Sequence, residues 1–341
     1  MIRSIYYSKD KQINTDLKPE AYRQALEDEG GLLWVDFEDS PPEEDEPILL
    51  EIFKFHPLAV DDALRETHVP KVDDWGKYLY IVLQSMEIRQ IKDNVLESLE
   101  LDAFLGKNFL VTHHDQKLEP IEHLWTTVQR DERHLSSGPD HLLYRLADEL
   151  ATRYMQLVEK MDEAIDTLED DIFDHPDPHI LEKIFALKRM TLHFQRMIAP
   201  EREVLNKLAR DDYSMIDEQA QVYYRDVYDH LVRLHDLSEN LRDLASGALD
   251  TYLSVINNRT NDIMKTLTII TAFFMPLSFV TGFFGMNFFA ADPPFTQWVS
   301  LPVFVLMLFL MVIIPLAMYF WMRQQGWTRN VERLPDAGKD R

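Results

Sequence analysis

The sequence contains no cysteine and relatively few basic residues. Without cysteine, the 341-residue chain can form neither disulfides nor thiolate metal sites, and it has no cysteine nucleophile. Its 35 Lys and Arg residues stand against 59 Asp and Glu residues, which gives a formal net charge of −24. Nucleic acids are bound by Lys and Arg that neutralise phosphates, so this charge argues against a nucleic-acid partner. Cations are the expected counter-charges, held by oxygen or imidazole.

Recognisable enzyme motifs are also missing. The chain has no P-loop, no nucleophile elbow and no catalytic pairing of carboxylates or histidines in a known pattern. These absences argue against an enzyme and against ATP-driven pumping, and we expect no organic cofactor. The first eleven residues carry charges and no apolar stretch, so we do not expect a cleaved signal peptide.

Two long uncharged stretches lie near the C-terminus, at 266–291 and 293–322. A hydrophobic run of about 20 residues can cross a hydrocarbon core about 30 Å thick, so the sequence predicts membrane helices at 263–285 and 299–322. Lys265 and Arg323 lie at the inner ends of the two spans, whereas the connecting loop, 286–298, has no Lys or Arg. The positive-inside rule therefore predicts both termini in the cytoplasm and a short outer loop.

The part that precedes the spans reads as an α/β domain followed by helices. Short runs rich in β-branched and aromatic residues predict strands at 32–35, 78–83 and 108–112, and a helix is expected at 57–64. A break at 136–140 ends a cytoplasmic α/β domain, 1–137. The segment 174–178 predicts the tip of an acidic helical hairpin at 138–212. A basic cytoplasmic tail, 323–341, follows the second span.

A further helical pattern begins near Asp217 and continues into the first span, with 213–262 as the cytoplasmic half of a long stalk helix. At 1.5 Å per residue, some 65 residues make about 100 Å of helix. Apolar residues recur at heptad spacing, at Val227, Leu234, Leu241, Ala248 and Val255, with Leu231, Ala245 and Tyr252 between them. This spacing is typical of a coiled-coil seam and favours self-association. The alternative is that the stripe packs against the chain's own hairpin.

Polar and small residues continue at three- and four-residue steps, on what we interpret as the same face, into the membrane. They are Asp250, Leu253, Asn257, Asn261, Met264, Leu267, Thr268, Thr271, Met275, Ser278 and Gly282. Two spans cannot enclose a pathway, but several copies of this face around an axis can. Because polar groups inside a membrane usually line water or a substrate path, we predict a pore. The alternative is a dry helix interface made of small residues.

Histidines near the end of one predicted strand form another candidate site. His113, His114 and Asp115 are consecutive, and imidazole with carboxylate is a common ligand set for transition metals. A pair of exposed histidines at a strand end explains the same residues.

Gly285-Met286-Asn287, at the outer end of the first predicted span, resembles the signature of the CorA family of divalent-cation transporters. The segments 225–230, 261–270 and 275–277 also match the family pattern, as do 56–62 and 70–72 in the soluble part. The resemblance covers nearly the whole chain. It implies a funnel-shaped homopentamer in the inner membrane of a prokaryote that conducts Mg2+, and also Co2+ or Ni2+, passively inward.

The resemblance assigns roles to individual residues. Gly285, Met286 and Asn287 would select a hydrated ion, because a neutral amide can hydrogen-bond to the waters that Mg2+ releases reluctantly. The polar stripe would line the pore, with a constriction of Met264, Leu267 and Met275 that closes by dewetting. Regulatory Mg2+ would bind between neighbouring subunits at Asp62 and Asp226, with Asp61 and Asp229 as further candidate ligands, and would close the pore.

One departure from the family pattern bears on the ion. Phe288 and Phe289 follow the motif, where many magnesium-transporting members have an acidic residue two positions after Asn. The alternative function is therefore that of a proton-coupled Zn2+ transporter of the related ZntB type. A further alternative is a membrane cation sensor that does not conduct.

Overall fold

The computed structural model describes residues 1–65, 68–90, 95–285 and 301–325, and divides the chain into two compact units after Leu253. The first unit is built on a seven-stranded sheet. Its strands are β1 (Ile2–Tyr7), β2 (Ile13–Thr15), β3 (Leu32–Glu38), β4 (Lys71–Asp74), β5 (Leu79–Gln90), β6 (Val95–Leu105) and β7 (Phe109–His114). The spatial order is β2-β1-β3-β7-β6-β5-β4, and only the β3–β7 pair is parallel. The three predicted strands, now β3, β5 and β7, are confirmed.

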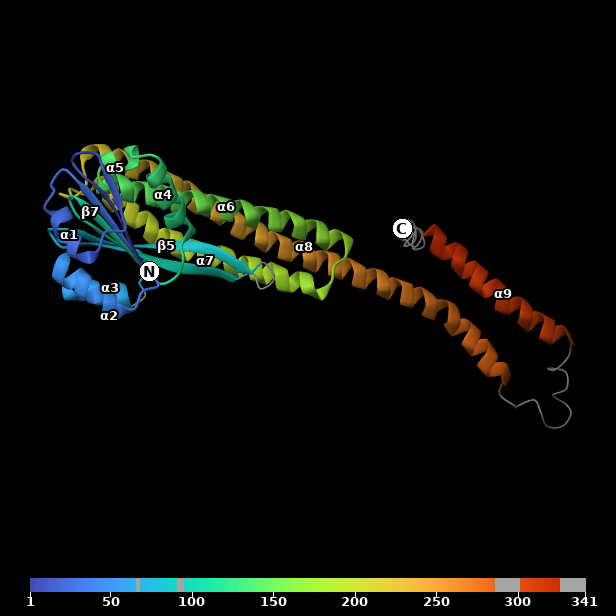
Figure 1. Cartoon of the computed structure of the whole chain (residues 1–341). Helices are drawn as coiled ribbons and strands as arrows, with labels where there is room; N and C mark the ends of the chain where they lie inside the picture. Colours follow the sequence, from blue (N-terminus) through green and yellow to red (C-terminus); the bar gives the residue numbers. More distant parts are fainter. Residues whose placement is uncertain (66–67, 91–94, 286–300, 326–341) are drawn as a thin grey trace. The chain divides into compact units, whose positions relative to one another are not determined.

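Helices cover both faces of this sheet (Figure 1). One face is packed by α1 (Pro19–Leu26), α2 (Pro42–Pro47), the π-helical turn Ile48–Ile52 and α3 (Pro57–Arg65). The other is packed by α4 (Glu119–Arg130), α5 (Arg133–Ser136) and the long helices that follow. Successive side chains of a strand point to opposite faces, so Leu33 and Val35 contact the first layer and Leu32 and Trp34 the second. Two covered faces explain why these strands read as continuous apolar runs.

The acidic hairpin consists of α6 (Pro139–Asp174) and α7 (Pro178–Arg210). Gly138 precedes α6 with a φ of 99°, where a side chain is disfavoured, and a Cβ there would lie 2.8 Å from Asp140 Oδ1. At the tip, the Asp177 carboxylate accepts a hydrogen bond from the His179 main-chain N–H at 3.0 Å and caps α7. The chain thus breaks close to the predicted boundaries at 137 and 212, although that division into domains itself stays a prediction.

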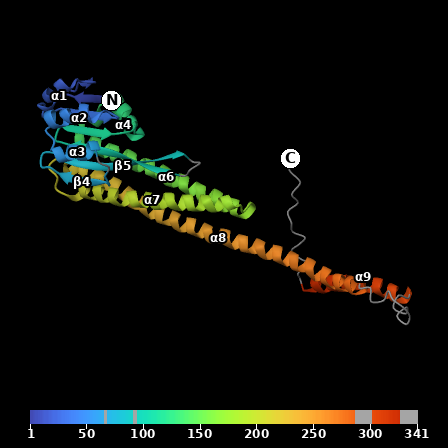
Figure 2. The same ribbon diagram turned by 90° about the horizontal axis from the view of Figure 1, so that it is seen from below.

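Helix α8 runs from Glu218 to Gly285, as the sequence predicts. Its heptad stripe, however, is buried inside the same chain, in the core that α6 and α7 also form (Figures 1 and 2). The buried positions are Val227, Leu231, Leu234, Leu241, Ala245, Ala248 and Tyr252. The prediction of self-association through this seam is therefore wrong. The hairpin of the same chain provides a long apolar surface. Because the stripe is buried against it, these side chains are not accessible to a second copy.

The sequence analysis assumed that the polar stripe continues the face of this seam. The structure shows that it does not. Tyr252 is buried whereas Asp250 and Leu253 are exposed. At about 100° per residue, Asp250 lies roughly opposite the sector that contains Leu241, Ala245 and Tyr252. Within the first unit, α8 therefore has one side against its own hairpin and another side, containing Asp250, directed away from it.

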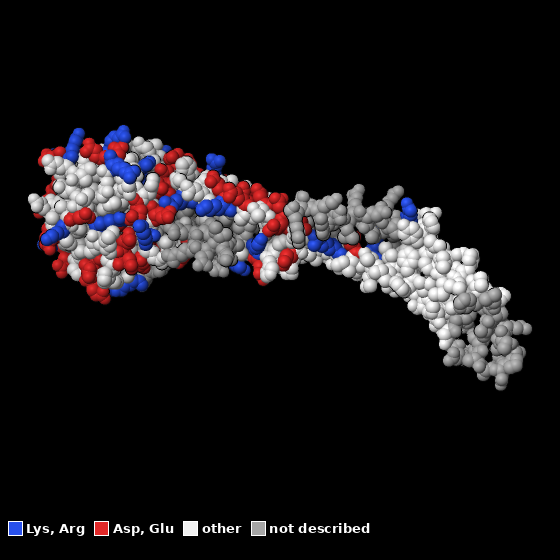
Figure 3. Space-filling view, turned by 45° about the vertical axis from the view of Figure 1, so that its right-hand side comes forward, with Lys and Arg blue, Asp and Glu red and all other residues white. Residues whose placement is uncertain are grey.

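The second unit contains the rest of α8 and α9 (Leu301–Gln324). Among the described residues, these are two helices long and apolar enough to cross a membrane. They coincide with the predicted spans, and residues 266–285 carry no charge. On the face of the first unit that Figure 3 shows, acidic and basic side chains are scattered among uncharged ones, including along the hairpin. The fold is therefore an α/β unit, long helices and two C-terminal apolar helices, as predicted from the sequence.

Candidate ion pathway and cation-binding sites

The predicted pore stripe is an exposed band along α8. The residues that form it are all exposed in the single chain: Asn257, Asn261, Met264, Leu267, Thr268, Thr271, Met275, Ser278 and Gly282. With Asp250, they fall within a sector of about 120° when placed at 100° per residue. Met264, Leu267 and Met275 are 57%, 62% and 66% exposed. Large apolar side chains exposed to this degree need a covering of lipid or of other protein.

Threonine hydroxyls along this helix are satisfied by its own backbone. Thr268 donates to the main-chain oxygen of Met264 at 2.7 Å, and Thr271 donates to that of Leu267 at 2.8 Å. Each hydroxyl proton is thereby used, while the oxygen lone pairs can still accept. The stripe therefore presents acceptors, which suits the hydrogen-bond-donating water shell of a cation.

The end of α8 carries the predicted selectivity motif. Gly285 is the last residue of the helix and is exposed. Met286 and Asn287 lie outside the described residues, as do the outer loop and Phe288-Phe289. Their predicted roles stay predictions.

Asp62, on α3, already has a cationic partner within its own chain. Lys71 of β4 donates from Nζ to Asp62 Oδ2 at 2.6 Å, and His68 Nε2 lies 3.7 Å from the same oxygen. Burial lowers the pKa of Lys71, but its hydrogen bond to Asp62 and the charge of that carboxylate raise it overall. Asp61 pairs with Arg65 instead. Any cation that reaches Asp62 must therefore compete with the ammonium group of Lys71. The sequence analysis missed this pairing, although 70–72 was part of the matching pattern.

Asp226, on α8, is exposed, as is Asp229. Its charge acts on Asp148 of α6: burial raises the pKa of Asp148 and Asp226 adds to that rise, while Arg145 and His230 oppose it. The charge of Asp226 thus destabilises the ionised form of Asp148, a situation that a bound cation relieves. Sequence reasoning missed Asp148, because nothing in its spacing links α6 to α8.

A cavity of about 240 Å3 lies beside Asp62, and the sequence analysis did not anticipate it. Its polar lining includes Glu100, Asp102 and His113. Burial raises the pKa of Glu100 to about 7, and the charge of Asp102 contributes. Glu100 Oε2 accepts a hydrogen bond from the His68 main-chain N–H at 2.7 Å. Because the His68 ring also approaches Asp62, the cavity wall is connected to the predicted regulatory carboxylate.

His113 and His114 lie at the end of β7, but they are buried, not exposed as the simpler interpretation of the sequence supposed. Consecutive residues of a strand face opposite sides of the sheet. Accordingly, His113 lies 3.7 Å from Asp102 and 4.0 Å from Asp45, whereas His114 lies 3.3 Å from Asp36. The two rings cannot be ligands of one metal ion.

Comparisons with known proteins agree with this architecture. The family model of the CorA-like Mg2+ transporter protein matches residues 29–324. The cobalt/magnesium transport protein CorA of Thermotoga maritima is 34% identical over 278 residues, which cover 81% of this chain and 78% of that protein. The zinc transport protein ZntB of Yersinia pseudotuberculosis is 23% identical over 301 residues, covering 86% of this chain and 87% of its own.

A solved structure shares the fold along nearly the full length. The complete CorA magnesium transporter of Methanocaldococcus jannaschii superposes with a TM-score of 0.79 at 24% identity, covering 95% of this chain and 98% of that one. The family match spans both the α/β unit and the two apolar helices, so it does not rest on the soluble part alone. The chain belongs to the CorA family of divalent-cation transporters, membrane proteins with two C-terminal apolar helices.

Proposed function

We propose that this chain assembles as a homopentamer around α8 and conducts Mg2+ passively into the cytoplasm. The observation that carries the proposal is the exposed stripe of hydrogen-bond acceptors and small residues along α8. Because one chain contributes only a single lining helix, the pathway has to be closed by further copies. Similarity to the cobalt/magnesium transport proteins supports Mg2+, with Co2+ or Ni2+ as further cargo.

The ion would be recognised with its water shell in place. Mg2+ dehydrates reluctantly, and its waters donate hydrogen bonds outward. A ring of Asn287 side chains at the outer mouth would accept those bonds, with Gly285 and Met286 as the other residues of the selectivity motif. Further in, the oxygens of Thr271, Thr268 and Asn261 offer acceptors at intervals along the helix. A hydrated ion then passes without ever losing its inner shell.

The closed state would be held by apolar side chains. Met264, Leu267 and Met275 are the bulky residues of the stripe, and several copies brought together around an axis form a constriction from which water withdraws. A hydrated dication cannot enter such a segment without losing its solvation.

Intracellular Mg2+ would regulate this constriction through the soluble units. We place regulatory ions at Asp62 and Asp226 of neighbouring chains, with Asp61 and Asp229 as outer ligands. A pentamer multiplies the charge of −24 on each chain, so self-repulsion favours a looser arrangement unless cations neutralise it. Lys71 already supplies part of that neutralisation at Asp62. The regulatory site would then respond to Mg2+ concentrations high enough to displace an ammonium group.

A second candidate is proton-coupled Zn2+ transport. Two observations favour it: the absence of an acidic residue two positions after Asn287, and the similarity to ZntB along most of the chain. Flux measurements on the full chain in proteoliposomes separate the functions. Influx of Mg2+ that is unaffected by a pH gradient supports the channel. Zn2+ influx that requires the gradient supports the alternative, and no flux of either ion would indicate a non-conducting sensor.

A further inference from the structure

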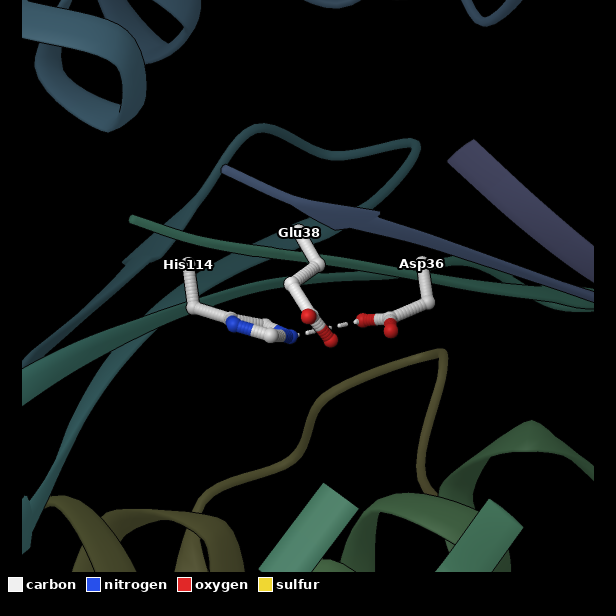
Figure 4. Close-up of side chains that lie close together, drawn as sticks. All are labelled: Asp36, Glu38 and His114. Carbon is white, nitrogen blue, oxygen red and sulfur yellow. Dashed lines mark ion pairs between the residues drawn. The ribbon is translucent and has the colours of Figure 1, made fainter. Parts of the chain in front are cut away.

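The ends of two parallel strands bring two carboxylates and an imidazole together inside the first unit. In the register of β3 and β7, Asp36 is paired with Thr112 and Glu38 with His114. Residues two apart on a strand share a face, so Asp36, Glu38 and His114 all point toward the α4 side of the sheet. Figure 4 shows their three side chains converging on one point.

The ligand atoms of these residues are spaced as a metal ion requires. One atom from each side chain lies within 4.8 Å of the other two. Asp36 Oδ1 and His114 Nε2 are 3.3 Å apart. Two ligands about 2.1 Å from a tetrahedral ion lie about 3.4 Å apart, so this separation fits a shared ion. The Asp36 and His114 side chains are completely buried, and Glu38 Oε2 is a buried oxygen that accepts no hydrogen bond from the described residues.

The orientation of the His114 ring is fixed by a hydrogen bond on the side away from the carboxylates. Its Nδ1 lies 2.6 Å from the main-chain oxygen of Gln116. A carbonyl can only accept, so Nδ1 carries a proton and Nε2 is left to face the carboxylates. Nε2 has no hydrogen-bond partner in the described structure. A ring whose distal nitrogen donates to a carbonyl is the usual arrangement of a metal-binding histidine.

The surrounding charges hold the carboxylates in place and leave the ligand atoms open. Arg3 of β1 contacts Asp36 through Oδ2, at 2.9 Å, which is the oxygen turned away from His114. The same guanidinium lies 2.6 Å from Glu122 and 4.3 Å from the ring centre of Trp125 on α4, but 3.9 Å from Glu38. Thr112 donates to Asp36 Oδ1. Arg3 therefore offsets one carboxylate charge and orients Asp36 without occupying the centre of the group.

Without a metal ion, a proton is the natural occupant of Nε2. Burial lowers the pKa of His114, but its contact with Asp36 raises it overall. The other charged groups around the ring are Glu38 on β3, Arg3 on β1, Glu122 on α4 and Lys117, which pairs with Glu122. A proton and a dication thus compete for the same lone pair.

We propose that Asp36, Glu38 and His114 form a site for one transition-metal dication, Zn2+, Co2+ or Ni2+, separate from the ion pathway. Imidazole combined with carboxylates favours these ions over Mg2+, which prefers oxygen alone. The site joins the ends of β3 and β7, so occupancy stabilises the α/β unit by mass action. It does not depend on the proposed channel function.

The test uses the full chain purified in detergent, with Mg2+ in large excess to fill the oxygen-only sites. Zn2+ is titrated in competition with a chromophoric chelator, and Co2+ binding is followed by its visible absorption. The wild type should bind one more Zn2+ per chain than His114→Gln. His113→Gln is the matched control, because it changes the neighbouring histidine on the opposite face and should bind like the wild type.

Equal Zn2+ stoichiometry and affinity in the wild type and His114→Gln would overturn the proposal. A loss of Zn2+ binding in His113→Gln as large as that in His114→Gln would also overturn it. If His114→Gln does not fold, Glu38→Gln provides the same test with less disturbance, since Glu38 makes only a 3.9 Å contact with Arg3. We expect its Zn2+ affinity to fall by at least about tenfold. An unchanged affinity in that variant would contradict the proposal.

Discussion

Glu201 is buried inside the first unit, where its carboxyl group, the Tyr154 hydroxyl and the Gln84 carbonyl lie close together. Tyr154 Oη lies 2.7 Å from Glu201 Oε2 and also contacts the main-chain oxygen of Gln84. A hydroxyl has one proton, and a carbonyl can only accept. Both contacts are hydrogen bonds only if Glu201 is itself protonated and donates to Tyr154. Burial raises the pKa of Glu201 to about 8, in agreement with this proton count.

The pH dependence of stability follows from that shift. The folded chain keeps a proton on Glu201 that the unfolded chain, with an ordinary pKa of 4.5, releases. The stabilisation is therefore complete below pH 4.5 and is lost as the pH rises toward 8. Integrated from pH 5 to pH 9, the shift at Glu201 lowers the free energy of unfolding by about 4 kcal/mol. For a unit of this size, that corresponds to roughly 8–16 °C in melting temperature.

Glu201→Gln tests the reasoning, because an amide reproduces the neutral acid, with an NH2 that donates to Tyr154 at every pH. We expect the melting temperature of the wild type, followed by tryptophan fluorescence of the full chain in detergent, to fall more steeply between pH 5 and pH 9 than that of Glu201→Gln. Glu203→Gln, an exposed change on the same helix, should retain the wild-type slope. Parallel curves for the wild type and Glu201→Gln would refute the assignment of a neutral Glu201.

Three further predictions concern transport and its regulation. Asn287→Ala should abolish Mg2+ uptake into proteoliposomes without changing assembly, and near-normal uptake would remove Asn287 from the selectivity site. Met264→Asp should make the closed channel leak at high intracellular Mg2+, because a wetted constriction loses its dewetting barrier; a tightly closed variant would place the gate elsewhere. Lys71→Met removes the ammonium that competes at Asp62, so protection of the soluble unit from proteolysis should require several-fold less Mg2+. The exposed Lys77→Met serves as its control, and an equal shift in both would show that general charge is responsible.

The strands and helices could be predicted because local patterns determine them. Continuous apolar runs such as 78–83 specify strands covered on both faces, and the break at 174–178 specifies a hairpin tip. The partner of the heptad stripe on α8 could not be predicted in the same way. A seven-residue apolar spacing is the same whether the helix packs on a second copy or on its own chain, and only the proximity of α6 and α7 decides between them.

Contacts between side chains of different helices and strands could not be predicted from local patterns. The pairing of Asp62 with Lys71 joins a helix to a strand nine residues later, and no periodicity links the two. The triad of Asp36, Glu38 and His114 depends on the parallel register of β3 with β7, which the sequence does not specify. The adjacent histidines suggested one metal site, whereas the alternation of the strand separates them and gives each its own carboxylates.

The opposite placement of the buried seam and Asp250 on α8 suits a pore better than a seam shared between copies would. A seam shared between copies would have placed the apolar stripe at the axis, and the polar residues would then have had to share that face. Instead, the side of α8 that carries Leu241 and Tyr252 is occupied by the chain's own hairpin, and Asp250 lies on the opposite side. Copies that gather with their hairpins outward would direct Asp250 toward the axis. In the proposed pentamer, α8 would thus use one face for folding and the opposite face for the ion.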